Sequence, residues 1–223
     1  MKADVAQRYT TLRAEIDAQA REAGRAGGDI VLVGVSKRQP HEAISAAIAA
    51  GLTDIGESYV QEAAAKLGLL PSVRKHYIGH IQTNKAKRIV DLFDMVQSVD
   101  REDAAKALGR AAEGCGRVLP VLLQLNISPT ERFGVLPELA EALAESVRSQ
   151  PFLRLEGVMA IGPDTPDAAE IARAFALAAK TLARVGGSTL SIGMSGDWRE
   201  AVRAGSTMLR IGTGLFGRRE EPQ

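Results

Sequence analysis

The sequence predicts an α/β fold of the (β/α)₈ barrel class, the TIM barrel, with an extra helix before the first strand. Three observations predict it. Apolar strand-like runs alternate with amphipathic helical segments, about eight strands are each followed by a helix, and polar or glycine residues follow the strand ends. We expect one domain over residues 1–223, because such a barrel needs roughly 200 residues or more. An open doubly wound sheet is the alternative.

The elements are assigned from periodicity and from start and stop residues. Val5, Leu12 and Ile16 recur at helical spacing, so a first helix occupies much of the chain before Gly24. An apolar strand at residues 30–36 follows, and then a helix that starts at Pro40 and ends near residue 51. Later strands are expected at residues 54–56, 76–78, 95–98, 118–125, 155–161, 190–192 and 207–211. The helices between them are expected at residues 59–67, 84–90, 101–113, 137–148, 166–186 and 198–204.

Two of the later helices show their buried faces clearly. In the helix that starts at Pro137, the apolar face is expected to consist of Leu139, Leu143 and Val147. The long helix starts at Pro166 and ends at two consecutive glycines, and its inward side chains are expected to be Ile171, Phe175, Leu182 and Val185.

Composition excludes several classes of function. Lys and Arg total 28 against 27 for Asp and Glu, so bulk charge draws the chain neither to nucleic acid nor to a membrane. We expect a small-molecule ligand and a monomer.

The single cysteine, Cys115, cannot form an internal disulfide and is interpreted as structural. No apolar signal segment or bilayer-spanning stretch is present, so we expect a cytoplasmic protein. The spacing of His41, His76 and His80 does not suit a metal site.

Lys37 is the first candidate functional residue, because it follows the apolar strand at residues 30–36. Alternate side chains of a strand share a face, so Val33, Val35 and Lys37 are expected to point the same way. An ammonium on a buried face is costly unless it is paired, deprotonated or covalently bound. Desolvation also makes a lysine amine more nucleophilic toward an aldehyde. The alternative is a lysine just beyond the strand whose ammonium reaches solvent.

The last strand carries the second candidate. Leu209 and Ile211 share its outer face, so Arg210 is expected to point into the barrel mouth, where a guanidinium needs an acceptor or an anion. The turn Gly212-Thr213-Gly214 offers N–H groups and a hydroxyl, and barrels bind phosphate in the loops after strands seven and eight. Ser195, after strand seven, can add a hydroxyl. The alternative is a glycine-rich turn that only bends the chain.

An amine that captures an aldehyde and a cradle for phosphate together indicate pyridoxal 5′-phosphate (PLP) as the ligand. The chain also carries a series of motifs: Val33-Gly34-Val35-Ser36-Lys37, Asp54-Ile55-Gly56-Glu57-Ser58-Tyr59-Val60-Gln61-Glu62, His76-Tyr77-Ile78-Gly79-His80-Ile81-Gln82-Thr83-Asn84-Lys85-Ala86-Lys87, Gln97-Ser98-Val99-Asp100-Arg101, Gly157-Val158-Met159-Ala160-Ile161, Gly193-Met194-Ser195 and Gly205-Ser206-Thr207-Met208-Leu209-Arg210-Ile211-Gly212-Thr213. With them, nearly the whole chain resembles the YggS/PROSC family of pyridoxal phosphate homeostasis proteins.

The resemblance implies a fold, a function and roles for individual residues. The fold is a barrel like the N-terminal domain of alanine racemase. The function is to hold and deliver PLP, with PLP-dependent apo-enzymes as possible recipients, and to balance amino-acid and keto-acid pools without an established catalytic reaction. Lys37 is implied as the Schiff-base lysine and Arg210 as the arginine beside the pyridine nitrogen. Ser195, Gly212 and Thr213 match the phosphate contacts.

Three further residues border the implied pocket, and the chain departs from the family pattern at two places. Met159 matches a residue that lines the ring pocket, and His80 lies in the motif at the mouth. Where the family has G-E-N-Y, this chain has Ser58 in place of the asparagine, which shortens a contact near the ring. Where the family has S-K-S-G-V, this chain has Glu131-Arg132-Phe133-Gly134-Val135, so a role of that loop in secondary cofactor binding or surface contacts is not expected to carry over.

Structural interpretations of the polar residues near the strand ends stay open beside the functional ones. His80 is equally well explained as a hydrogen-bonded histidine at a strand end. Asp54 and Glu57 are expected to cap and solvate their turn rather than to form a catalytic pair. The run Lys85, Lys87, Arg88 is expected to form a solvated helix face.

Two classes of function fit a PLP site. A carrier needs only to bind and release the cofactor, whereas an enzyme such as a racemase needs a second acid or base across the ring from Lys37. Alanine racemase places that group on a separate domain, for which 223 residues are expected to leave no room. Arg210 beside the pyridine nitrogen disfavours its protonation and weakens the ring as an electron sink. The carrier is therefore the expected function; a Schiff-base aldolase explains Lys37 but not Arg210.

Overall fold

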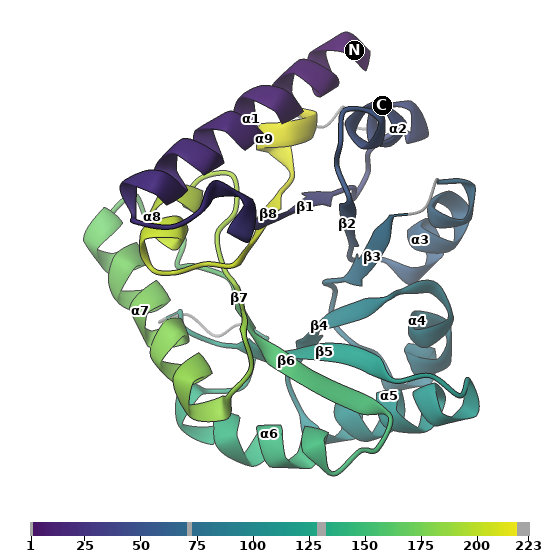
Figure 1. The fold of residues 1–223 in the computed structure, drawn as a ribbon. Helices are drawn as coiled ribbons and strands as arrows, with labels where there is room; N and C mark the ends of the chain where they lie inside the picture. The colour runs from purple at the N-terminus through teal and green to yellow at the C-terminus, as the bar shows by residue number, and fades with distance from the viewer. Residues whose placement is uncertain (1, 71–72, 129–132, 218–223) are drawn as a thin grey trace.

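The computed structural model describes residues 2–70, 73–128 and 133–217. Within these residues eight parallel strands close into a barrel in chain order, because β1 pairs with both β2 and β8 (Figure 1). The strands are β1 (Val31–Val35), β2 (Asp54–Glu57), β3 (Arg74–Tyr77), β4 (Met95–Val99), β5 (Leu119–Leu125), β6 (Leu153–Ala160), β7 (Thr189–Ser191) and β8 (Met208–Ile211). The predicted barrel is confirmed, and the open sheet is wrong.

Helices surround the barrel (Figure 1). They are α1 (Lys2–Glu22), α2 (His41–Ala49), α3 (Val60–Lys66), α4 (Ala86–Leu92), α5 (Glu102–Gly114), α6 (Ala140–Arg148), α7 (Ala168–Val185), α8 (Trp198–Arg203) and α9 (Thr213–Phe216). Each predicted helix has a counterpart whose bounds differ by a few residues. Across the described part of the chain, none of these helices is both long and apolar enough to cross a bilayer.

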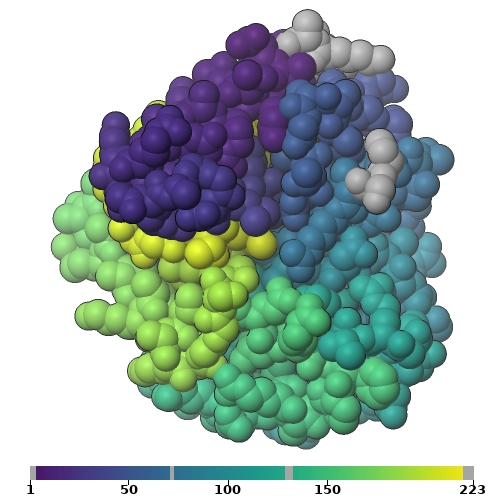
Figure 2. Space-filling view, viewed as in Figure 1, coloured from purple at the N-terminus to yellow at the C-terminus, as the bar shows by residue number. Residues whose placement is uncertain are grey.

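Helix α1, the predicted extra helix, completes the outer layer of the barrel. Within the residues that the structure describes, β8 is followed by α9, whose four residues are too few to cover the join between β8 and β1. Helix α1 contacts α2, α8 and α9, and it buries Val5, Leu12 and Ile16 there. In Figure 2 the purple α1 lies over the yellow C-terminal segment. The first helix of the chain therefore occupies the place of a full helix after the eighth strand.

The interior of the barrel holds two kinds of side chain. An apolar cluster consists of Val33, Met95, Leu122, Met159 and Met208. The polar side chains buried within the strands include Asp54, His76, Gln97, Ser191 and Arg210. Because side chains alternate along each strand, these residues face inward while their neighbours pack against the helices. The barrel is thus filled by side chains, with a polar set beside the apolar one.

One predicted buried face is partly wrong. Leu143 and Val147 of α6 are buried, but Leu139 is 55% exposed. The reason is that residues 137–139 form a turn of 3₁₀ helix before α6 begins, and its three-residue period does not continue the 3.6-residue period of α6. In α7 the prediction holds better, since Ile171 and Phe175 are buried there.

Candidate functional site

Lys37 lies just beyond β1 at the C-terminal end of the barrel. In the parallel register Val35 pairs with Gly56, so the segment after β2 runs beside Lys37. The Lys37 side chain is half-buried, and its Nζ lies 4.6 Å from the centroid of the Tyr59 ring. The ammonium is therefore neither enclosed in the apolar core nor extended freely into water. It rests on an aromatic face, which attracts a cation.

The backbone on both sides of Lys37 is held by α3. Arg38 has a φ of 56°, in the left-handed region that side-chain-bearing residues seldom adopt. Its N–H donates to Glu62 Oε1 at 2.6 Å, and Lys66 pairs with the same carboxylate. Lys66 Nζ also donates to the Ser36 carbonyl at 3.5 Å. An ion pair on a neighbouring helix therefore maintains the strained turn that presents Lys37.

Glu57 joins the ends of β1 and β2 from a buried position. Its Oε1 accepts from the N–H groups of Ser58 at 2.7 Å and Tyr59 at 3.3 Å, and its Oε2 accepts from the Ser36 hydroxyl at 3.3 Å. Burial raises the pKa of Glu57, although these backbone hydrogen bonds oppose the shift. The expectation of solvated turn residues is wrong for both carboxylates, because Glu57 is 0% and Asp54 7% exposed.

The residues predicted to hold a phosphate lie together beside β1. The Gly214 N–H donates to Ser195 Oγ at 3.1 Å, which joins the loop after β7 to the start of α9. A Cβ on Gly212 would lie 3.6 Å from Val35 Cβ, so this turn runs close to the end of β1. Thr213 is exposed at the first position of α9. Two hydroxyls and backbone N–H groups of one short turn form a donor set that suits phosphate.

Arg210 is buried inside the barrel rather than extended from its mouth. Its Nη1 donates to the hydroxyl and the carbonyl oxygen of Ser191, both at 2.7 Å, and its Nη2 donates to the Ala160 carbonyl at 2.9 Å. Burial lowers the pKa of Arg210 to about 10, with the charge of Asp197 opposing the shift. The side chain is thus a cation at neutral pH. Hydrogen bonds to described residues account for three of its five N–H donors.

The remaining predicted residues lie at different depths. Met159 is fully buried in the interior cluster, and its backbone pairs with Ser191. Ser58 is half-buried after β2, where Gly79 approaches so closely that a Cβ on it would overlap the Ser58 carbonyl oxygen. His80 is exposed on the rim. The structure therefore places Ser58 and His80 around one pocket near the rim and Met159 deeper in the barrel.

The exposed ring of Phe133 covers His80. The two ring centroids are 4.1 Å apart with 28° between the planes, so the rings stack. The Phe133 carbonyl accepts from the Gln124 side chain at 2.8 Å, which ties this segment to β5. Phe133 belongs to the loop in which the chain departs from the family pattern; Glu131 and Arg132 of that loop lie outside the described residues.

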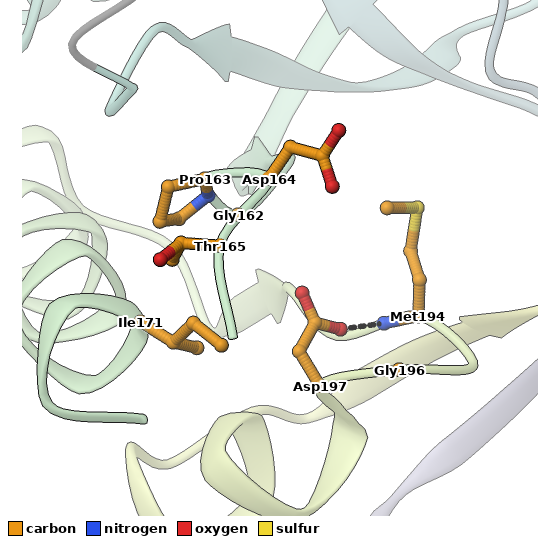
Figure 3. Close-up of a pocket in the computed structure, with 8 residues that line it drawn as sticks. All are labelled: Gly162, Pro163, Asp164, Thr165, Ile171, Met194, Gly196 and Asp197. Atoms are coloured by element: carbon orange, nitrogen blue, oxygen red, sulfur yellow. Dashed lines mark hydrogen bonds between the residues drawn. The ribbon is translucent and has the colours of Figure 1, made fainter. Parts of the chain in front are cut away.

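A pocket of about 380 Å³ is lined in part by Met194 and Gly196, the chain neighbours of Ser195 (Figure 3). It lies between the loops that follow β6 and β7, which contribute Asp164 and Asp197. Asp197 Oδ1 accepts from the Met194 N–H at 2.5 Å, and burial raises the pKa of Asp197. Met194 directly precedes Ser195, so one carboxylate fixes the backbone of the loop that carries this hydroxyl.

Sequence reasoning missed the residues that hold the candidates in place. Ser191 contacts Arg210 directly. Because alternate side chains of a strand share a face, the sequence places Ser191 and Thr189 on the same face of β7, and this signal could have identified Ser191 as an inward residue. Glu62 and Lys66 had no comparable signal, because an i,i+4 ion pair is common on any exposed helix. Only the packing of α3 against the turn after β1 gives that pair its role.

Comparison with known proteins gives a consistent set of similarities. Residues 11–220 match the family model of the alanine racemase N-terminal domain. The chain is 41% identical over 221 residues to a pyridoxal phosphate homeostasis protein of Pseudomonas aeruginosa, covering 97% of this chain and 96% of that protein. The structure of PipY from Synechococcus elongatus, with PLP bound, has 34% identity and a TM-score of 0.85, covering 96% of this chain and 100% of PipY. Alanine racemase of Bacillus anthracis has the same fold at 15% identity and a TM-score of 0.76, covering 100% of this chain and 57% of that one.

We predict that Lys37→Met raises the pKa of Tyr59. A side-chain hydrogen bond from Lys37 and its positive charge both favour the phenolate and lower this pKa, so removing the cation removes the shift. Ultraviolet titration of the ligand-free protein can measure it, because the chain has three tyrosines and burial raises the pKa of the other two, Tyr9 and Tyr77, the latter to about 12. Tyr59→Phe is the control that must abolish the earliest ionisation. The same early ionisation in Lys37→Met and wild type would contradict the contact.

Proposed function

Because the chain belongs to the family of pyridoxal phosphate homeostasis proteins, we propose that it binds PLP at the C-terminal end of its barrel and acts as a carrier of this cofactor. The observation that carries the proposal is the arrangement around β1. The amine of Lys37 ends this strand, and the donor set of Ser195, Thr213 and the Gly212 turn lies beside the same strand end. The PLP bound to PipY, a relative of nearly equal length, supports the choice of ligand.

The chemistry of the donor set fits PLP. The cofactor requires an amine for its aldehyde, several donors for its phosphate and a hydrogen-bond partner for its pyridine nitrogen. Lys37 offers the amine, Ser195 and Thr213 offer hydroxyls, and Arg210 offers N–H donors. When bound, PLP supplies an electrophilic carbonyl carbon and a ring that can withdraw electrons.

The other predicted residues shape the space around this donor set. We propose that Met159 forms part of the apolar floor under the ring and excludes water from it, because it is fully buried in the interior cluster. Ser58 lines a pocket near the rim together with Tyr59 and His80. His80, with Phe133 stacked on it, forms the outer rim, where it faces solvent and any partner protein. These positions leave the exposed side of the site for entry and release of the cofactor.

We favour a carrier over an enzyme because of Arg210. A guanidinium can only donate, so it binds a pyridine nitrogen that is unprotonated, and an unprotonated ring is a weaker electron sink. The alternative is an amino-acid racemase, which the likeness to alanine racemase suggests. At 15% identity that likeness concerns the fold alone. A carrier of this kind supplies PLP to PLP-dependent apo-enzymes, and the match over residues 11–220 supports a single domain for this task.

We predict that borohydride reduction of the PLP-loaded protein fixes a pyridoxyl group on Lys37. Peptide mass mapping should find the added mass there, since only this lysine amine stands at the end of β1. Lys37→Ala should lose the visible absorption and keep its fold, because a truncated half-buried lysine opens no large cavity. Lys87→Ala, which removes an exposed lysine of α4, is the matched control and should keep the absorption. Label on Lys85 or Lys87 in the wild type would contradict the assignment.

We predict that pyridoxal without its phosphate binds at least about a hundredfold more weakly than PLP. The loss of several charge-assisted hydrogen bonds, each worth about 1.5–3 kcal/mol, gives this magnitude. Ser195→Ala should weaken PLP binding and leave pyridoxal binding unchanged. Ser149→Ala, at the exposed end of α6, should alter neither. Titration calorimetry with both ligands measures the difference, and equal affinities for PLP and pyridoxal would rule out the phosphate cradle.

We predict that the PLP-loaded protein does not racemise, transaminate or decarboxylate common amino acids at an enzymatic rate. The reason is the unprotonated pyridine nitrogen that Arg210 favours. Chiral chromatography and keto-acid assays with alanine and serine test this, with an authentic alanine racemase as the positive control. Turnover on the order of 10 per second would establish an enzyme in place of a carrier.

A further inference from the structure

A continuous chain of hydrogen bonds crosses the barrel interior, and we call its five residues the interior relay. Its members are Arg210 on β8, Ser191 on β7, Gln97 on β4, His76 on β3 and Asp54 on β2. The successive contacts are Arg210 Nη1 to Ser191 Oγ at 2.7 Å, Ser191 Oγ to Gln97 Oε1 at 2.7 Å, Gln97 Nε2 to His76 Nδ1 at 2.9 Å, and His76 Nε2 to Asp54 Oδ1 at 2.8 Å. Each side chain belongs to a residue less than a tenth exposed.

The two ends of the interior relay fix its direction. Arg210 can only donate, so Ser191 Oγ accepts from it and its hydroxyl donates a hydrogen bond to Gln97 Oε1. At the other end, burial alone would raise the pKa of Asp54, but hydrogen bonds from His76 and Thr53 outweigh burial and lower it. Asp54 is therefore a carboxylate that accepts the Nε2–H of His76.

Gln97 determines the state of His76. Its Nε2 lies 2.9 Å from His76 Nδ1 and 3.2 Å from Met208 Sδ, so each amide N–H has an acceptor. The reversed amide would set its oxygen against the Met208 sulfur and its nitrogen, a donor, against the Ser191 hydroxyl, which already accepts from Arg210. His76 Nδ1 is therefore an acceptor, and the imidazole is neutral with its proton on Nε2.

All the donors of the interior relay thus point from the cation at Arg210 toward the anion at Asp54. Hydrogen bonds aligned head to tail polarise one another, and charges of opposite sign at the two ends favour that alignment. Nη1 is held by two acceptors on Ser191, which fixes the plane of the guanidinium. We propose that Ser191, Gln97 and His76, anchored on Asp54, are positioning residues that aim the remaining N–H donors of Arg210 at the pyridine nitrogen of PLP. This inference rests on the proposed function.

The first test uses the ligand-free protein and ¹⁵N NMR of its histidine rings. The expected spectrum has one protonated nitrogen, Nε2, and one hydrogen-bonded acceptor nitrogen, Nδ1, for His76. The other two histidines are identified with His41→Ala and His80→Ala. Gln97→Leu should move the Nδ1 resonance of His76 toward the value of an unbonded nitrogen and leave Nε2 unchanged. A His76 ring with protons on both nitrogens at neutral pH would overturn the interior relay.

The second test measures PLP affinity and the visible absorption maximum of the bound cofactor. Ser191→Ala should weaken binding about tenfold and displace the maximum, and Ser191→Thr should restore both. The matched control is Ser206→Ala, since Ser206 is also 0% exposed but its hydroxyl donates to the Ile192 carbonyl at 2.8 Å, outside the relay. Gln97→Leu, which leaves every contact of Arg210 in place, serves as the second variant if Ser191→Ala does not fold, with the same expected displacement.

The two hypotheses fail in different ways. A wild-type protein that binds no PLP contradicts the proposed function, and the NMR experiment still decides the direction of the interior relay. Wild-type binding combined with the same affinity and absorption maximum in Ser191→Ala as in Ser206→Ala overturns the positioning role. A uniform loss of affinity in Ser191→Ala, Ser191→Thr and Ser206→Ala overturns it too, because this loss would reflect packing of β7 and β8 alone.

Discussion

The burial of one guanidinium inside the barrel is the constraint on which the site depends. A cation there is tolerated only if its donors meet acceptors, and Arg210 finds them in the Ser191 side chain and in carbonyl groups of β6 and β7. This requirement places polar residues in strands that would otherwise be apolar, from Ser191 across to Asp54. The site at the barrel mouth and the polar half of the barrel interior are therefore one system, organised around a single positive charge.

Lys37 is positioned by contacts that hold the backbone around it. The residue after it adopts a left-handed conformation that costs of order 1–3 kcal/mol for a residue with a side chain. The Glu62–Lys66 pair of α3 holds the backbone on both sides of Lys37, the buried carboxylate of Glu57 holds the Ser36 hydroxyl, and these contacts offset the cost. The conformation of the turn that carries the amine is thus set by contacts from neighbouring segments. Two neighbouring segments, α3 and the end of β2, must be in place before Lys37 is correctly aimed.

The sequence predicts the barrel, the extra helix and the inward direction of Arg210, because alternation and periodicity depend on local spacing. It does not predict the burial of Asp54 or Glu57, since a carboxylate at a strand end looks the same whether it faces water or the interior. The predicted burial of Leu139 is wrong because a 3₁₀ turn has no distinct sequence signature. Alternation along β3 and β4 would have placed His76 and Gln97 inside, but the contact between Gln97 and Ser191 joins β4 to β7, which face each other only once the barrel is closed.

The position of α1 has a consequence for the order of assembly during synthesis. The barrel closes where β1 meets β8, and α1 covers that join together with α9, so segments that are far apart in the sequence form one unit. Contacts between segments so far apart in sequence form late, because a long loop must close first. Arg210 lies on the strand that closes the barrel, and the turn that starts at Gly212 directly follows that strand. During synthesis on the ribosome, Lys37 therefore emerges long before Arg210 and the turn that starts at Gly212. The complete site forms only when β8 has paired with β1 and the barrel has closed.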